Sequence, residues 1–167
     1  MYIELLEANT GQKVKGIISR ATLSDAPLIK EGWSFNWQEL LRTEGSTFFK
    51  ITLIDSPDKI EGIVMLSIYF GEMVYMNNLE LAPHNIGKQK KYDWVAGCLI
   101  AYGCRFSMEE GKGSYQGFLT FESKSKLIPL YEKKYGATCT LGQKMFIDIQ
   151  QGEKLIKQYL SNDQFEE

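Results

Sequence analysis

The chain has 167 residues, of which 44% are hydrophobic and 24% are charged, a size and composition that fit one folded domain over residues 1–167. Its formal net charge of −2 gives no broad basic field for a phosphate backbone, so we expect no nucleic-acid partner. The apolar runs are too short to cross a bilayer, and Glu4 and Glu7 interrupt any secretory signal, so we expect no membrane partner and a cytoplasmic location.

The cysteines Cys98, Cys104 and Cys139 show no paired-ligand spacing and leave an odd count. We expect them to be buried free thiols in a reducing compartment. No cluster of His, Cys, Asp or Glu has the spacing of metal ligands, so we expect no metal.

The first part of the chain alternates between strand and short helix signals. Residues 2–7 and 14–18 favour strands and flank a turn-rich triplet, so they predict an opening hairpin. Ser24 is a possible N-cap for a helix that Gly32 ends, and Asn36 can cap a second short helix.

A meander of three strands follows. Residues 49–53 alternate between apolar and polar side chains, the pattern of a half-buried strand. The turn at 56–59 leads into a long β-rich run over 60–70, and Gly71-Glu72 suits a hairpin turn before the returning strand at 73–81.

The second half begins with a polar, basic loop over 82–93. Behind the loop, apolar residues recur at helical spacing until Gly111, namely Val95, Cys98, Leu99, Tyr102 and Phe106. The apolar run 115–121 predicts a strand, and this strand–helix–strand crossover implies a parallel neighbour.

A further helix is expected after residue 122, with Ser123 or Ser125 as its N-cap, Pro129 in or next to its first turn, and Gly136 at its end. The chain should close with a hairpin over 138–149, a helix over 153–160 and a frayed acidic tail over 161–167. Together these elements predict an α+β domain with a mixed, mainly antiparallel sheet flanked by helices.

The segment from the strand end at Leu81 to the helix start near Trp94 has the features of an anion site. The first amides of a helix lack internal partners, and the helix dipole favours negative charge there. Gly87 lets the backbone approach an anion closely, and three lysines add positive charge. A solvated basic loop is the alternative interpretation.

The order of these pieces resembles the acetyl-CoA-binding core of the GCN5-related N-acetyltransferases, the GNAT family. Five pieces carry the resemblance. They are Leu79-Glu80-Leu81-Ala82-Pro83, Asn85-Ile86-Gly87-Lys88, residues 94–100 at the start of the expected helix, the expected strand at 115–121, and Leu130-Tyr131-Glu132-Lys133-Lys134-Tyr135-Gly136-Ala137. Two features depart from the family pattern: Ile86 replaces a frequent arginine, and Trp94 and Ala96 stand where the second and third loop glycines are expected, after a short insertion.

The resemblance implies a twisted sheet with a V-shaped splay between its two central strands, where the pantetheine arm of acetyl-CoA would lie. The residues that it implies for cofactor binding are Leu79, Leu81, Ala82, Gly87, Lys88, Lys90, Lys91, Tyr92, Asp93, Trp94 and Ser125. It also implies that Tyr131 is the general acid for the departing thiolate, although Tyr131 could instead be a core tyrosine.

The base that takes the ammonium proton is expected to be Glu80, with a solvated strand carboxylate as the alternative interpretation. His84, the single histidine, is a further candidate. The aromatic segment Trp33–Trp37 could form one wall of an acceptor groove or simply pack helices onto the sheet.

The resemblance therefore implies an enzyme that transfers an acetyl group from acetyl-CoA to a primary amine by direct attack, acting as a monomer or homodimer. The sequence does not identify the acceptor amine. Two alternatives stay open: a GNAT-fold acyl-CoA-binding or protein-interaction module without catalytic activity, and an unrelated α+β interaction protein.

Overall fold

A computed structural model describes residues 1–160, and the tail predicted over 161–167 lies outside the described residues. The strands are β1 (Tyr2–Glu7), β2 (Lys13–Arg20), β3 (Ser46–Leu53), β4 (Ser56–Tyr69), β5 (Met73–Leu81), β6 (Tyr92–Asp93), β7 (Leu119–Glu122), β8 (Thr138–Cys139) and β9 (Lys144–Ile147). The helices are α1 (Trp37–Leu40), α2 (Val95–Glu110), α3 (Ile128–Tyr135) and α4 (Ile149–Tyr159). Five 3-10 turns complete the chain: η1 (Leu23–Asp25), η2 (Ile29–Glu31), η3 (Pro83–Asn85), η4 (Gly113–Tyr115) and η5 (Ser125–Leu127).

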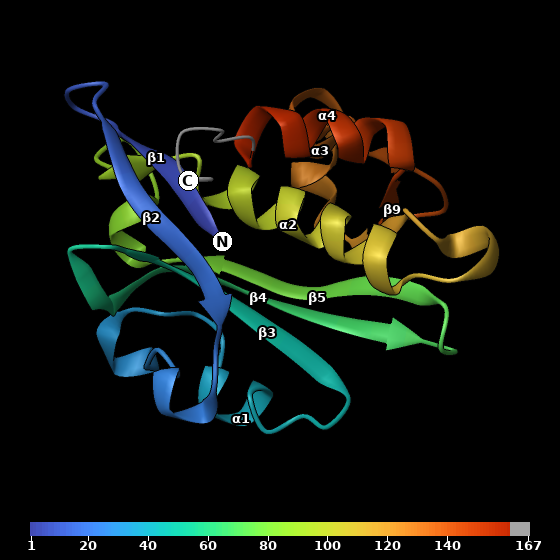
Figure 1. Ribbon diagram of the computed structural model, residues 1–167, viewed down its shortest axis with the longest axis horizontal. Coiled ribbons are helices and arrows are strands. Elements are labelled where there is room, and N and C mark those ends of the chain that lie inside the picture. The colour runs from blue at the N-terminus through green and yellow to red at the C-terminus, as the bar shows by residue number, and fades with distance from the viewer. Residues whose placement is uncertain (161–167) are drawn as a thin grey trace.

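A nine-stranded sheet in the order β6-β1-β2-β3-β4-β5-β7-β9-β8 runs through the molecule. Its neighbouring strands are antiparallel except for the parallel pair β5 and β7. Helices α2, α3 and α4 lie on one side of the sheet and α1 lies on the other (Figure 1). The predicted α+β architecture with a mainly antiparallel sheet is confirmed.

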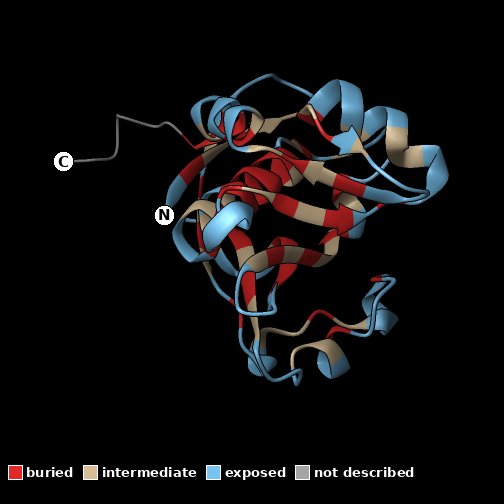
Figure 2. Ribbon diagram, turned by 90° about the vertical axis from the view of Figure 1, so that its right-hand side faces the viewer, coloured by how far each residue is buried: buried red, intermediate tan, exposed pale blue. Residues whose placement is uncertain are grey.

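Most of the hydrophobic core lies between the sheet and α2, where the buried residues gather (Figure 2). Gly62 on β4 permits this close packing, because a Cβ atom there would lie only 2.6 Å from Cγ1 of Val95. A smaller cluster on the opposite face is built around Trp37, whose side chain is fully buried. No helix within residues 1–160 is long and apolar enough to cross a membrane.

The central strands β5 and β7 pair only between Val74 and Met76 on β5, although β5 continues to Leu81 along β4. The register between β4 and β5 skips Asn77, which is the extra residue of a β-bulge. A bulge bends its strand, and the two strands diverge from this point. This divergence is the V-shaped splay that the resemblance implied.

The structure corrects two predicted elements. The helix expected from Ser24 is replaced by the turns η1 and η2, and Thr22 with Asp25, rather than Ser24, forms the capping contacts of η1. The strand expected over 115–121 begins only at Leu119, since Gly117 adopts φ +87° and its amide donates to the carbonyl of Ser107. The chain therefore turns back over the end of α2 before it extends.

Three smaller differences concern element ends. The closing helix α4 starts at Ile149 instead of residue 153, because the Asp148 side chain caps it by accepting from the Gln151 amide at 2.9 Å. The predicted loop before α2 ends in β6, which pairs with β1 and forms the edge of the sheet. The turn between β4 and β5 centres on Phe70 and Gly71, both with positive φ.

Candidate functional site

The gap between β5 and β7 exposes backbone groups of the last β5 residues. The amide of Ala82 donates to the Glu61 carbonyl on β4 at 3.0 Å. Backbone groups of a strand point alternately to its two neighbours, so the amides of Leu79 and Leu81 face the gap. An extended ligand lying between the strands would find these groups available.

The N-terminus of α2 opens beside this gap without a side-chain cap. Its N-cap residue is Trp94, which adopts φ 77°, the left-handed conformation that glycine favours. Trp94 thus has the backbone geometry of glycine at a position where the sequence lacks one. A Cβ atom on Gly87 (φ +85°) would meet no atom within 4 Å, so the preceding loop leaves open space around this residue.

The three lysines of this loop differ in their surroundings. Lys90 forms an ion pair with Asp93 at 2.5 Å, and the Lys91 ammonium lies 5.5 Å from the centre of the Tyr92 ring. Lys88 is exposed and forms no ion pair within residues 1–160. Lys88 is therefore the lysine of this loop with the most freely available charge.

A buried polar network braces the base of this loop. The Glu61 side chain is only 1% exposed, and its Oε1 atom lies 2.5 Å from Nε2 of His84. Asn85 Nδ2 donates to the Glu61 carbonyl at 3.0 Å and to Glu61 Oε1 at 3.2 Å. The amide of Tyr92 donates to Asn85 Oδ1 at 3.0 Å, and the amide of Lys91 donates to the His84 carbonyl at 2.8 Å.

These contacts join both ends of the loop to each other and to β4. The sequence does not point to Glu61 and Asn85 as residues that hold this loop, because their contact spans 24 positions. The position of Asn85 between a proline and a glycine was the only local sign of a structured turn. Within the described residues, Oε2 of Glu61 has no hydrogen-bond partner.

Tyr131 lies on α3, with its ring 5.0 Å from that of Phe121 on β7 and 5.8 Å from that of Tyr135. Burial raises the pKa of Tyr131, so its phenol stays protonated at neutral pH. Its hydroxyl makes no hydrogen bond to any residue within 1–160. Ser125 opens η5 and accepts a hydrogen bond from Gln143 Nε2 at 3.1 Å.

Glu80 points to the sheet face opposite α2 and is only 8% exposed. Its carboxylate accepts three hydrogen bonds: from the amide of Ser34 at 2.6 Å, the amide of Phe35 at 3.1 Å and Nε1 of Trp37 at 2.8 Å. The carboxylate therefore holds the segment that leads into α1.

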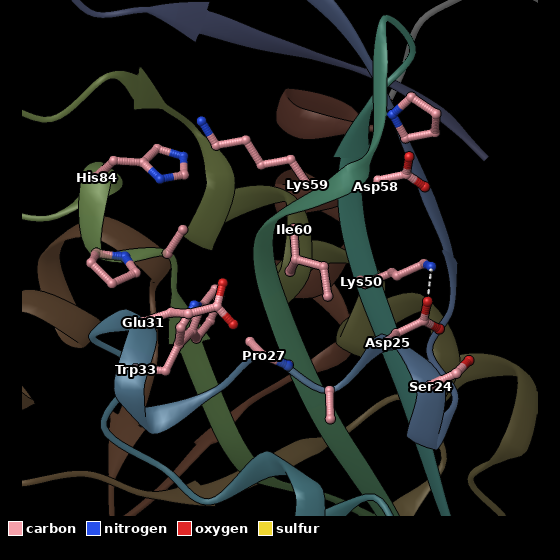
Figure 3. Close-up of a pocket in the computed structure, with 14 residues that line it drawn as sticks. Ser24, Asp25, Pro27, Glu31, Trp33, Lys50, Asp58, Lys59, Ile60 and His84 are labelled. Atoms are coloured by element: carbon pink, nitrogen blue, oxygen red, sulfur yellow. Dashed lines mark hydrogen bonds and ion pairs between the residues drawn. The ribbon is translucent and has the colours of Figure 1, made fainter.

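Of the hollows on the same side of the sheet as α1, two matter for the site. The larger, about 740 Å³, is lined by η1, η2 and the β3–β4 hairpin, with His84 on its rim (Figure 3). Lys50 Nζ donates to Asp25 Oδ1 at 2.7 Å within it. The second, about 530 Å³, is lined by β5, β7 and β9. Among residues 1–160, no group of His, Cys, Asp or Glu is arranged to hold a metal ion.

A splayed, mainly antiparallel sheet with an uncapped helix beside the splay defines the GNAT fold, and solved structures bear this out. The KacTA–DNA complex has a TM-score of 0.61 at 13% identity, covering 86% of this chain and 99% of that one. AtaTR bound with acetyl-CoA has a TM-score of 0.61 at 17% identity, covering 84% and 98%. A mutant of the spermidine N-acetyltransferase SpeG from Vibrio cholerae has a TM-score of 0.56 at 15% identity, covering 82% and 95%.

At these identities the likeness establishes the fold, which this chain shares with GNAT acetyltransferases. No protein-family model and no curated protein matches the sequence. The comparison corrects one expectation from composition. We expected no nucleic-acid partner from the net charge of −2, yet a structure of the same fold is a complex with DNA. Net charge averages over the whole surface and cannot exclude such a partner.

Proposed function

We propose that this protein is an N-acetyltransferase that transfers the acetyl group of acetyl-CoA to a primary amine. The observation that carries the proposal is the gap between β5 and β7 beside the uncapped N-terminus of α2. The gap offers backbone groups to an extended pantetheine arm, much as a sheet edge accepts an added strand. The helix N-terminus offers free amides to a pyrophosphate.

In this proposal Leu79, Leu81 and Ala82 line the pantetheine arm, and Ser125 contacts the cofactor from the opposite side of the gap. The pyrophosphate contacts come from the loop and the start of α2, namely Gly87, Lys88, Lys90, Lys91, Tyr92, Asp93 and Trp94. Lys90 and Lys91 already have partners, so Lys88 is the first source of charge for the phosphates. The acetyl-CoA-bound AtaTR structure supports this choice of cosubstrate.

The chemistry is attack by the neutral amine on the thioester carbonyl. A C–N bond forms, the C–S bond breaks, and the departing thiolate takes a proton from the hydroxyl of Tyr131. The phenol suits this role because burial keeps it protonated and no described residue occupies its hydroxyl. The amine must lose one proton, and Glu80 is the proposed acceptor through a bridging water, since three donors already engage its carboxylate.

Two measurements test the proposal. Titration calorimetry should detect acetyl-CoA binding, and a thiol-release assay with a panel of amines should detect transfer. Tyr131→Phe should slow turnover by about tenfold or more while acetyl-CoA affinity stays nearly unchanged. The matched control is Tyr115→Phe, because Tyr115 is an exposed tyrosine on η4. Unchanged turnover in Tyr131→Phe would remove Tyr131 from the mechanism.

One feature favours a second candidate, an acyl-CoA-binding module without transfer activity. Ile86 and Trp94 replace residues that are usual in the phosphate loop of the family, and such a replacement can accompany loss of activity. Acetyl-CoA binding without thiol release from any amine would support this module. Absence of binding would exclude both candidates.

A further inference from the structure

The hollow of about 530 Å³ is a groove on the face of the sheet that α2 does not cover. In a strand, neighbouring side chains point to opposite faces. Val74 and Phe121 lie in the core on the α2 side, so Tyr75 and Glu122, which follow them, point into the groove. Tyr69, Lys144 and Phe146 also line the groove.

This groove reaches the point where β5 and β7 separate. Glu122 directly follows Phe121, the last β7 residue that pairs with β5. On the β5 side, the bulge residue Asn77 donates from Nδ2 to the hydroxyl of Tyr69 at 3.0 Å. The ring of Tyr69 stacks on that of Tyr75 with 4.8 Å between their centres. The aromatic wall of the groove is therefore attached to the residue that opens the gap.

Two opposite charges line the groove without a direct ion pair between them. Glu122 and Lys144 are cross-strand partners on β7 and β9, but neither forms an ion pair within residues 1–160. Glu122 lies two residues along β7 from Thr120, the cross-strand partner of Tyr75, and so points to the same face as the aromatic wall. Burial and the Glu122 carboxylate raise the pKa of Tyr75. Glu122 is nearer to the gap, and Lys144 lies one strand further away.

We propose that this groove binds the amine acceptor, and that the acceptor is a monocationic primary amine on an aromatic stem. A carboxylate beside aromatic faces attracts an ammonium group by charge and by cation–π contact. The faces of Tyr75 and Phe146 suit an aromatic stem. Lys144 repels a second ammonium group, so the groove disfavours polyamines.

This inference rests on the proposed acetyltransferase function and gives it a substrate class. It places the amine on the open face of the sheet, while Tyr131 on α3 packs against β7 from the α2 side. The amine would thus reach the gap from the open face of the sheet. The departing thiolate would take its proton from Tyr131 on the α2 side.

The test uses tyramine and spermidine as acceptor probes with the full chain, and acetyl-CoA affinity is measured separately by calorimetry. We expect kcat/KM to be higher for tyramine than for spermidine. Glu122→Gln should raise the KM for tyramine about tenfold and leave the Kd for acetyl-CoA unchanged. Lys144→Glu should lower the KM for spermidine about tenfold by replacing repulsion with attraction.

The exposed α4 residue Glu153 supplies the control variant Glu153→Gln, which should change neither KM. The inference is overturned if spermidine is the better substrate of the unmodified chain, if neither probe is acetylated while acetyl-CoA binds, or if Glu122→Gln leaves the tyramine KM unchanged. Failure of acetyl-CoA to bind is a different result, because it overturns the acetyltransferase proposal itself.

Discussion

The carboxylate of Glu80 has a structural task that is independent of any catalytic one. In the variant Glu80→Gln, one carboxylate oxygen becomes an amide NH₂ that faces N–H donors, so at least one donor loses its acceptor. We expect the free energy of unfolding to fall by about 1–3 kcal/mol. Urea unfolding measures this change, with the exposed Glu44→Gln as the control. Equal stability of the two variants would contradict the hydrogen-bond assignment.

Trp94 shows why residue types alone mislead at a single position. In the sequence, the missing glycine counts against a phosphate-binding loop at this place. The structure retains the left-handed backbone at this position with a tryptophan. The residue type determines how much free energy the left-handed backbone conformation costs. The contacts with neighbouring residues determine whether the chain adopts it. A single sequence contains no direct sign of those contacts.

Among the elements, η3 and the loop after it depend on the buried amide of Asn85. Asn85→Ala leaves the buried Tyr92 amide without its acceptor and removes one of the two donors to the Glu61 carbonyl, which keeps the Ala82 amide. We expect a loss of about 2–3 kcal/mol in stability and weaker acetyl-CoA binding, because the loop loses its brace. Thermal unfolding and calorimetry measure the two effects.

The turn residue Asn9, which is exposed, provides the control Asn9→Ala. If acetyl-CoA affinity is the same in both variants, the brace does not position the phosphate loop. A fall in affinity for Asn85→Ala alone would connect the buried network to cofactor binding.

The elements that the sequence predicted well are those with long, regular patterns. The strands β3, β4 and β5 and the helix α2 were found because their apolar residues repeat with the strand or helix period over many positions. The helix predicted from Ser24 to Gly32 is wrong, because the 3-10 turns in this segment are too short to show a period, whereas the predicted cap at Asn36 is present. The form of these turns depends on local contacts such as the one between Thr22 and Asp25.

At the scale of the whole molecule, burial divides the three cysteines into two kinds. Burial raises the pKa values of Cys98 and Cys104 from 9.0 to about 12, while Cys139 is partly exposed. We expect one thiol per folded chain to react with Ellman's reagent near pH 8, and three after denaturation. Rapid reaction of all three in the folded chain would contradict this burial.

The same pKa values set a direction for stability at alkaline pH. The buried thiols stay protonated in the folded chain, whereas in the unfolded chain they ionise above pH 9. Their contribution to the free energy of unfolding is therefore fully present below pH 9, and it is lost as the pH rises towards 12. Urea unfolding over this range should show the decline, and Cys98→Ala with Cys104→Ala should reduce it.

Periodicity and turn residues predicted the mixed sheet, but the gap at its centre came only from the family resemblance. The gap depends on the bulge at Asn77 and on the short pairing of β5 with β7. The pairing of β5 with β7 joins residues more than 40 positions apart in the sequence, such as Val74 and Leu119, and the bulge depends on the register between β4 and β5, which no local pattern fixes. The groove beside the gap was missed for the same reason, since Tyr75 and Glu122 come together only in the folded sheet.

The unequal exposure of the tryptophans gives the protein an intrinsic optical reporter. Trp33 and Trp37 are 7% and 0% exposed, whereas Trp94, at the start of α2, is 37% exposed. Iodide in solution should therefore quench the fluorescence of Trp94 and leave the emission of the other two almost unchanged. A nucleotide bound to the loop would shield the Trp94 indole from iodide. The loss of quenching would then report nucleotide binding without any attached dye.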